Sequence, residues 1–130
     1  MRIRLAFSTV ATLIGLCGAA HADIISGGPV YGGPASIGGQ VTCRFFNAGL
    51  FSITLPVRQI WTNTNVLVAP VADSCNVAVT PGRYCAFTAN IAGNLAYSCR
   101  AYVSGIDNNV SGVAEVKNPA SAILNSVPID

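Results

Sequence analysis

Apolar and polar residues alternate along most of the chain, which is the pattern of strands that bury one face. In QVTCRFFN, residues 40–47, Cys43 and Phe45 would share one face, while Arg44 and Phe46 would share the other. Similar runs occupy residues 50–61, 66–71, 75–91, 95–103, 110–118 and 122–129. Short runs rich in Val, Ile, Thr, Phe and Tyr predict an all-β chain, and no helix is expected from residue 23 onward.

The spacing of turn residues indicates how these strands are arranged in the fold. Gly, Pro or Asn interrupts the runs about every eight to twelve residues, which is typical of a sandwich or barrel. We expect a two-layer antiparallel β-sandwich of about seven to nine strands, although residues 66–79 fit one bent strand or two. Pro56 predicts an edge position or a bulge, since proline cannot donate to a neighbouring strand. The Gly- and Pro-rich start, residues 23–39, should hold at most a short edge strand around Val30 and Tyr31.

Residues 1–22 resemble a cleaved export signal. Arg2 and Arg4 precede an apolar stretch, and Ala20-His21-Ala22 has the small residues that signal peptidase requires. The apolar stretch is short for a membrane-spanning helix. We therefore expect cleavage after Ala22, a secreted or periplasmic protein without a transmembrane segment, and a single domain over residues 23–130.

Cleavage would remove the chain's excess of positive charge. The full chain has a formal net charge of +2, and Arg2 and Arg4 account for it. The remaining side chains carry five positive and five negative charges, with no histidine. A protein that binds nucleic acid or an anionic membrane surface would need a basic stripe, and none is present. Neither class of partner is expected.

Four cysteines follow the signal segment, and an even count in an exported chain predicts two disulfides with three possible connectivities. Cys43 and Cys99 lie on the apolar faces of strong runs, so they would meet across the core from opposite sheets. Cys75 and Cys85 flank a Pro-Gly turn. A strict two-residue hairpin would place Cys75 opposite Thr88, so this second bond requires a wider connection. We favour Cys43–Cys99 with Cys75–Cys85.

Two resemblances follow from these residues. The order Cys43…Trp61…Tyr97-Ser98-Cys99 resembles the inter-sheet disulfide, core tryptophan and tyrosine corner of immunoglobulin domains, although Trp61 lies farther from the first cysteine than is usual. The segments FNAG and SCNVAVTPGRYCAFTANI are similar to small Ig-like modules of bacterial exported proteins, including abnormal-spindle/hydin-like domains. These resemblances imply an Ig-like sandwich, a core role for Trp61 and a Tyr97 hydroxyl turned onto nearby backbone. They imply no catalytic residue.

The residues required for most enzyme chemistry are missing from the predicted mature chain. Without histidine there is no Ser-His-Asp or Cys-His arrangement, and the cysteines are expected to be oxidised. Glu115 beside Lys117 is expected to be a surface carboxylate, and Asp73 and Asp107 lie in turn-rich stretches. The Gly-rich start lacks the lysine of a phosphate-binding loop. We expect neither an enzyme nor a cofactor or metal.

Two pairs of outward residues are candidates for binding. Arg44 with Phe46, and Arg100 with Tyr102, combine the residue types that are enriched at binding hot spots. A solvated sheet face, with arginine stems covering apolar surface, is the alternative interpretation. The two pairs should lie on opposite outer faces if Cys43 and Cys99 join the two sheets.

These observations favour a non-catalytic, exported Ig-like module that binds a protein or a cell-envelope component. The first alternative is a structural subunit of a surface fibre or envelope assembly, formed by strand addition. Residues 23–39, or the tail after Pro119, would then be the donor strand. The second alternative is a hydrolase inhibitor that presents the loop from Thr80 to Arg83.

Overall fold

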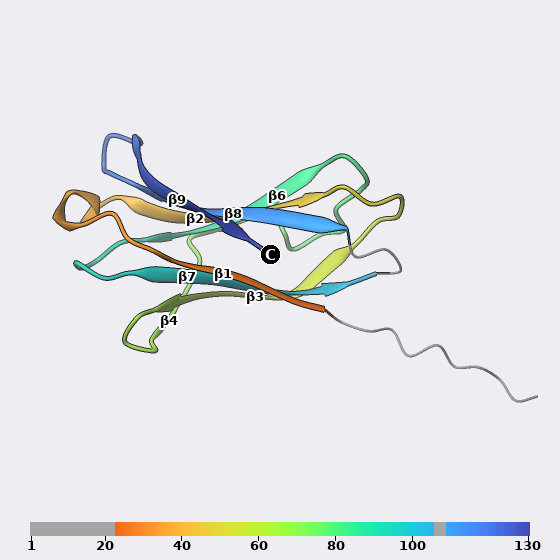
Figure 1. Cartoon of the computed structure of the whole chain (residues 1–130), viewed down its shortest axis with the longest axis horizontal. Helices are drawn as coiled ribbons and strands as arrows, with labels where there is room; N and C mark the ends of the chain where they lie inside the picture. The colour runs from red at the N-terminus through yellow and green to blue at the C-terminus, as the bar shows by residue number, and fades with distance from the viewer. Residues whose placement is uncertain (1–22, 106–108) are drawn as a thin grey trace, which may run out of the picture.

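The computed structural model describes residues 23–105 and 109–130, which fold into two antiparallel sheets packed face to face (Figure 1). The predicted all-β sandwich with two disulfides is therefore confirmed. In the described chain the only helix is a short 3-10 turn, Pro34–Ser36, and no helix is long and apolar enough to cross a membrane. The predicted signal segment and Asp107 lie outside the described residues.

The four-stranded sheet has the order β1-β7-β3-β4, and the five-stranded sheet has the order β5-β6-β2-β8-β9. The first sheet consists of β1 (Asp23–Val30), β7 (Tyr97–Ser104), β3 (Thr54–Thr62) and β4 (Leu67–Val68). The second consists of β5 (Ala72–Asp73), β6 (Tyr84–Asn90), β2 (Gln40–Asn47), β8 (Val110–Lys117) and β9 (Ile123–Ile129). The segment 66–79 thus contains two short strands, one in each sheet.

The core lies between the sheets and follows the predicted alternation. In β2 the side chains of Cys43 and Phe45 are buried, and Phe46 points outward. Phe45 stacks on Phe87 of β6, with ring centroids 5.7 Å apart. Burial of such alternating apolar faces is the main favourable term in folding, at about 25 cal/mol per Å² of apolar surface.

The two disulfides have the predicted connectivity and serve different purposes. Cys43 of β2 and Cys99 of β7 join the two sheets through the core, with Cα atoms 5.8 Å apart. Cys75 and Cys85 close a local loop, with Cα atoms 5.0 Å apart. The connection is wider than a two-residue hairpin, as expected. The last residue before it that pairs with β6 is Asp73, and Cys75 lies beyond the paired segment.

Two expectations about strands and one about the core were wrong. The Gly-rich start forms an eight-residue strand, β1, because Gly27 allows the chain to approach β9: a Cβ on Gly27 would lie 2.4 Å from the Pro128 carbonyl oxygen. Residues 75–79 form only a single bridge, Ile53 to Val79, and leave Val77 exposed. Trp61 is half-buried on the outer face of its sheet and does not belong to the core.

The position of Trp61 follows from a bulge in β3. The pairing of β3 with β7 shifts register between Thr54 and Val57, which confirms a bulge at Pro56. A bulge adds one residue to a strand. After it, the side chains at odd and even positions point to the opposite faces from those before it. Leu55 points inward before the bulge, but after it Ile60 is buried and Trp61 faces out.

All four sheet edges are short, bulged or covered. The strands β4 and β5 are only two residues long. The strand β1 lies against the end of β9, where the Ser26 amide donates to the Asp130 carbonyl oxygen at 3.2 Å, and Asn125 donates to the Tyr31 carbonyl oxygen at 3.1 Å (Figure 1). Both β1 and β9 also contain register shifts. Natural sheets use such features to avoid edge-to-edge pairing.

Candidate binding surfaces

The two predicted pairs of outward residues lie on opposite faces of the molecule. Arg44 and Phe46 lie on the outer face of the five-stranded sheet, and Arg100 and Tyr102 on that of the four-stranded sheet. The disulfide joins their strands through the core, so the outward positions point away from each other. The two faces are therefore separate surfaces.

On the five-stranded sheet, strand pairing extends the first pair into a cluster. Tyr84 pairs directly with Phe46, and Val113 pairs with Arg44. Tyr84 is 66% exposed and Phe46 is 41% exposed. The Arg44 guanidinium carbon lies 5.9 Å from the centre of the Tyr84 ring, within the range of a cation–π contact. We call Arg44, Phe46, Tyr84 and Val113 the Arg44 cluster.

The charges around the Arg44 cluster are mainly positive. Glu115 receives two cations, with Arg44 Nε 3.3 Å and Lys117 Nζ 3.7 Å from the same carboxylate oxygen. Glu115 faces outward from β8 beside Lys117, as expected, but its side chain is only 13% exposed. Arg83 is exposed directly before Tyr84. This part of the surface therefore has three cations and one carboxylate, and two of the cations contact that carboxylate.

A hollow of about 340 Å³ lies within the Arg44 cluster. On β8 it is lined by Ser111, a small residue on the outer face, and by Gly112. A Cβ on Gly112 would lie 2.5 Å from the Arg44 carbonyl oxygen, so no larger residue fits without moving the backbone. Gly112 therefore allows the close packing of β8 on β2 beside the hollow.

Asn47 fixes the loops at the end of this face. Its buried side chain donates to the carbonyl oxygens of Phe51 at 2.8 Å and Val79 at 2.9 Å, and accepts from the Gly49 amide at 3.0 Å. The loop held in this way exposes Leu50 and Phe51. The end of the sandwich next to the Arg44 cluster is therefore apolar, and its backbone is fixed.

The loop from Thr80 to Arg83 is a tight turn. The Arg83 amide donates to the Thr80 carbonyl oxygen at 3.1 Å, and Gly82 has a φ of +73°, as expected for Pro-Gly in a type II turn. The Gly82 amide donates to the Asn47 carbonyl oxygen at 2.8 Å. The turn is thus held by its own hydrogen bond and by β2, and it exposes the Arg83 side chain.

On the four-stranded sheet, Arg100 is exposed and Tyr102 is half-buried. Their neighbours across β3 are Gln59 and Val57, and Trp61 lies one pair farther along, opposite Ser98. The indole N–H of Trp61 donates to Gln59 Oε1 at 3.2 Å, which orients the ring along the strand. This face therefore also combines arginine with aromatic side chains.

The Tyr97 hydroxyl is turned onto nearby backbone, which is the role implied by the resemblance to immunoglobulin domains. Its side chain is buried, and its hydroxyl oxygen accepts hydrogen bonds from the backbone N–H groups of Ala92 and Gly93. Burial raises the pKa of the Tyr97 phenol above 10.0, and the two hydrogen bonds offset part of that rise. Tyr97 therefore anchors the turn between β6 and β7.

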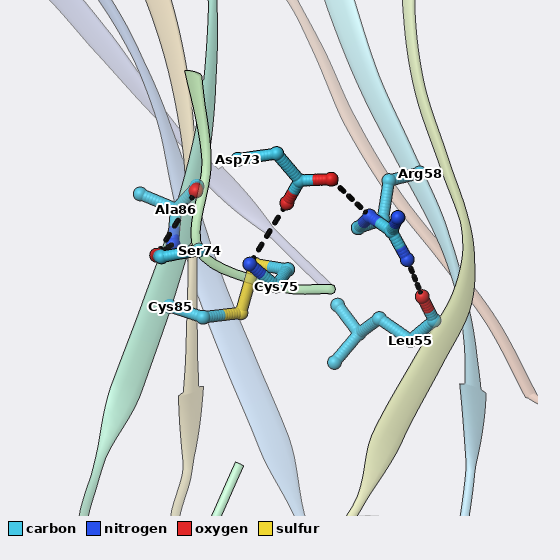
Figure 2. The surroundings of a disulfide bond; sticks show 7 residues. All are labelled: Leu55, Arg58, Asp73, Ser74, Cys75, Cys85 and Ala86. Atoms are coloured by element: carbon cyan, nitrogen blue, oxygen red, sulfur yellow. Dashed lines mark hydrogen bonds and ion pairs between the residues drawn. A yellow bond between two sulfur atoms is a disulfide. The ribbon is translucent and has the colours of Figure 1, made fainter. Parts of the chain in front are cut away.

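An ion pair that the alternating pattern does not predict joins the sheets beside the second disulfide. Arg58 Nε of β3 donates to Asp73 Oδ2 of β5 at 2.7 Å, and Arg58 also donates to the Leu55 carbonyl oxygen (Figure 2). Asp73 Oδ1 accepts from the Cys75 amide at 2.8 Å. The turn role expected for Asp73 is confirmed, and its second oxygen also links the two sheets.

Tyr84 and Trp61 were missed as surface residues for different reasons. Tyr84 precedes Cys85 in an alternating run, so its outward phase was readable from the sequence, but its pairing with Phe46 depends on the register of β2 and β6. Trp61 takes its orientation from the bulge at Pro56. Among the described residues, no group of three or more His, Cys, Asp or Glu side chains could hold a metal ion.

Comparison of the chain with family models, with curated proteins and with solved structures found no match.

Proposed function

We propose that this chain is a non-catalytic, exported Ig-like module that binds a protein partner through the Arg44 cluster. The observation that carries the proposal is the combination, on one sheet face, of two exposed aromatic rings, an arginine stacked on one of them and a preformed hollow. Tyrosine and arginine are enriched among residues that dominate binding energy. The export signal is the expectation from residues 1–22, and the two disulfides suit an exported chain.

The charges define the chemistry of the partner. With three cations and one carboxylate around the Arg44 cluster, a carboxylate on the partner would be attracted to this face. The hollow between Phe46, Tyr84 and Val113 suits an aliphatic or aromatic side chain. The partner surface would therefore present an apolar anchor next to an acidic residue.

Site-specific photo-crosslinking in the exporting cell tests this proposal. A benzophenone amino acid replaces Tyr84 in one chain, and Ser126 in a matched control chain. Ser126 is exposed on β9 of the same sheet, three strands from the β6 strand that carries Tyr84. We expect a crosslinked protein only from position 84, and we expect excess wild-type chain to compete it away.

Excess Tyr84→Ser chain should fail to compete. A product that consists of two or more copies of this chain would instead favour the assembly subunit. Equal crosslinking from positions 84 and 126, or full competition by the Tyr84→Ser chain, would contradict the proposed surface.

A further inference from the structure

A second hollow lies on the opposite side of the molecule, on the outer face of the four-stranded sheet. Its volume is about 520 Å³, within the range of about 300–1,000 Å³ that is common for small-ligand sites. Its lining includes Gly28, Trp61, Asn63, Asn65, Ser98 and Arg100. We call this site the Trp61 hollow.

Small residues next to a large ring create the space. Trp61 projects from β3, and its direct neighbour on β7 is Ser98. Beyond Ser98 the chain of β1 bulges at Gly27 and Gly28. A Cβ on Gly28 would lie 2.9 Å from the Tyr97 carbonyl oxygen, so this backbone packs closely on β7, and neither Gly27 nor Gly28 adds a side chain to the hollow.

The polar side chains near the ring lie on a turn with a fixed backbone and are themselves exposed. The turn after β3 is fixed by hydrogen bonds from the Asn65 amide to the Thr62 carbonyl oxygen at 3.0 Å, and from the Val66 amide to Thr62 Oγ1 at 3.1 Å. This turn presents the amides of Asn63 and Asn65. Within the described chain, neither amide side chain makes a hydrogen bond.

Arg100 supplies the charge of the Trp61 hollow. It is the one charged residue among the described residues that line the site, and within the described chain its guanidinium makes neither a hydrogen bond nor an ion pair. It sits diagonally across from Trp61, since its direct neighbour on β3 is Gln59. An unpaired guanidinium presents five donors in a fork that matches a carboxylate.

We propose that the Trp61 hollow binds an acidic saccharide. The apolar face of a sugar ring packs on a tryptophan ring, which is a large and rigid contact surface. Amide side chains both donate and accept, as sugar hydroxyl groups do, and the free guanidinium of Arg100 would bind a uronate carboxylate. This site is separate from the Arg44 cluster, and the inference does not depend on the proposed protein partner.

The chain offers a direct probe, because Trp61 is its only tryptophan. We expect the emission of the disulfide-bonded chain to change saturably on titration with oligosaccharides that carry galacturonate, glucuronate or mannuronate. Neutral malto-oligosaccharides of equal length should bind at least about tenfold more weakly, because Arg100 would lose its partner. Calorimetry measures the same affinities without relying on fluorescence.

Two variants and one control complete the test. Arg100 is exposed and has no partner, so Arg100→Gln should fold normally and lose about tenfold in affinity for the acidic oligomers. Trp61→Ala, measured by calorimetry, should abolish detectable binding. Tyr84→Ser, on the opposite face, should bind these oligomers as the wild type does, even where it loses the protein partner.

Three results would overturn the inference. The first is the absence of a saturable signal with all three classes of uronate at concentrations up to the millimolar range. The second is an Arg100→Gln chain with wild-type affinity. The third is equal affinity for neutral and acidic oligomers.

Discussion

At the scale of single residues, Tyr97 and Asn47 show how buried polar groups fix the loops of this sandwich. Tyr97 accepts two backbone hydrogen bonds from the turn before β7, and Asn47 bonds to three backbone groups of the neighbouring loops. No buried side-chain nitrogen or oxygen in the described residues lacks a partner. Since an unpaired buried polar group is costly, each of these side chains specifies one loop conformation.

Tyr97→Phe should lower the free energy of unfolding by about 1–2 kcal/mol, because two backbone N–H groups lose their acceptor. Chemical denaturation measures the loss. Tyr102→Phe is the matched control: Tyr102 lies on the same strand, is half-buried and makes no hydrogen bond within the described chain, so its effect should stay within about 0.5 kcal/mol. Equal effects from the two variants would contradict the role given to Tyr97.

The same pair of variants predicts a dependence on pH. Because burial raises the pKa of Tyr97 above 10.0, the unfolded chain loses this proton first as the pH increases. The stability from the neutral buried phenol is complete below about pH 10 and is lost as the pH rises through the folded pKa. The difference in unfolding free energy between wild type and Tyr97→Phe should therefore shrink above pH 10. A difference that grows above pH 10 would contradict the raised pKa of Tyr97.

At the scale of the elements, alternation in the sequence predicted the strands that pair in the middle of the sheets. It succeeded for β2, β6, β7 and β8, since each buries one face and no chain irregularity changes its phase. It failed for β1, where glycines replace apolar side chains to allow the approach of β9, and for the orientation of Trp61 after the bulge at Pro56. Close backbone contacts and bulges depend on the neighbouring strand, so the alternation within one segment of the sequence does not predict them.

The sequence predicted which face each candidate surface lies on, but not all of the residues that form it. The opposite placement of Arg44 and Arg100 followed from the alternation and the assumed disulfide, and the structure confirms it. The contribution of Tyr84 required the register between β2 and β6. The Trp61 hollow required two irregularities, the bulges of β1 and β3, that lie far apart in the sequence.

The ion pair between β3 and β5 gives a prediction at this scale. Asp73→Ala should destabilise the chain more than Asp73→Asn, because asparagine keeps an oxygen for the Cys75 amide and loses only the charge. A double-mutant cycle of Asp73→Asn with Arg58→Gln should give a coupling of about 0.5–1 kcal/mol, since both side chains are about one fifth exposed. A coupling of zero would show that the contact does not tie the sheets together.

At the scale of the whole molecule, the fold is a sandwich whose two sheets are joined in the core and along both sides. The Cys43–Cys99 bond joins the sheets through the core, Arg58 and Asp73 join them at one side, and β1 meets β9 at the other. The two terminal strands that were considered as donor strands are both paired within the chain itself. Strand addition would therefore require β1 or β9 to leave its place in these sheets.

The two disulfides should contribute unequally to this closure. On the chain-entropy model, the bond that closes the longer loop contributes about 4 kcal/mol and the local bond about 3 kcal/mol. Replacing Cys43 and Cys99 by alanine should therefore cost more stability than replacing Cys75 and Cys85, as measured by denaturation or, for a chain too unstable to isolate, by the yield of folded protein. A larger cost for the local pair would contradict the central role of the inter-sheet bond.

The most direct test of the account is the native mass of the chain recovered from the exporting cell under non-reducing conditions. A closed binding module predicts the mass of one processed chain with two disulfides and no free thiol, alone or with one copy of a different protein. A ladder of masses at multiples of this chain would contradict the account, because it would show that the chain assembles with itself.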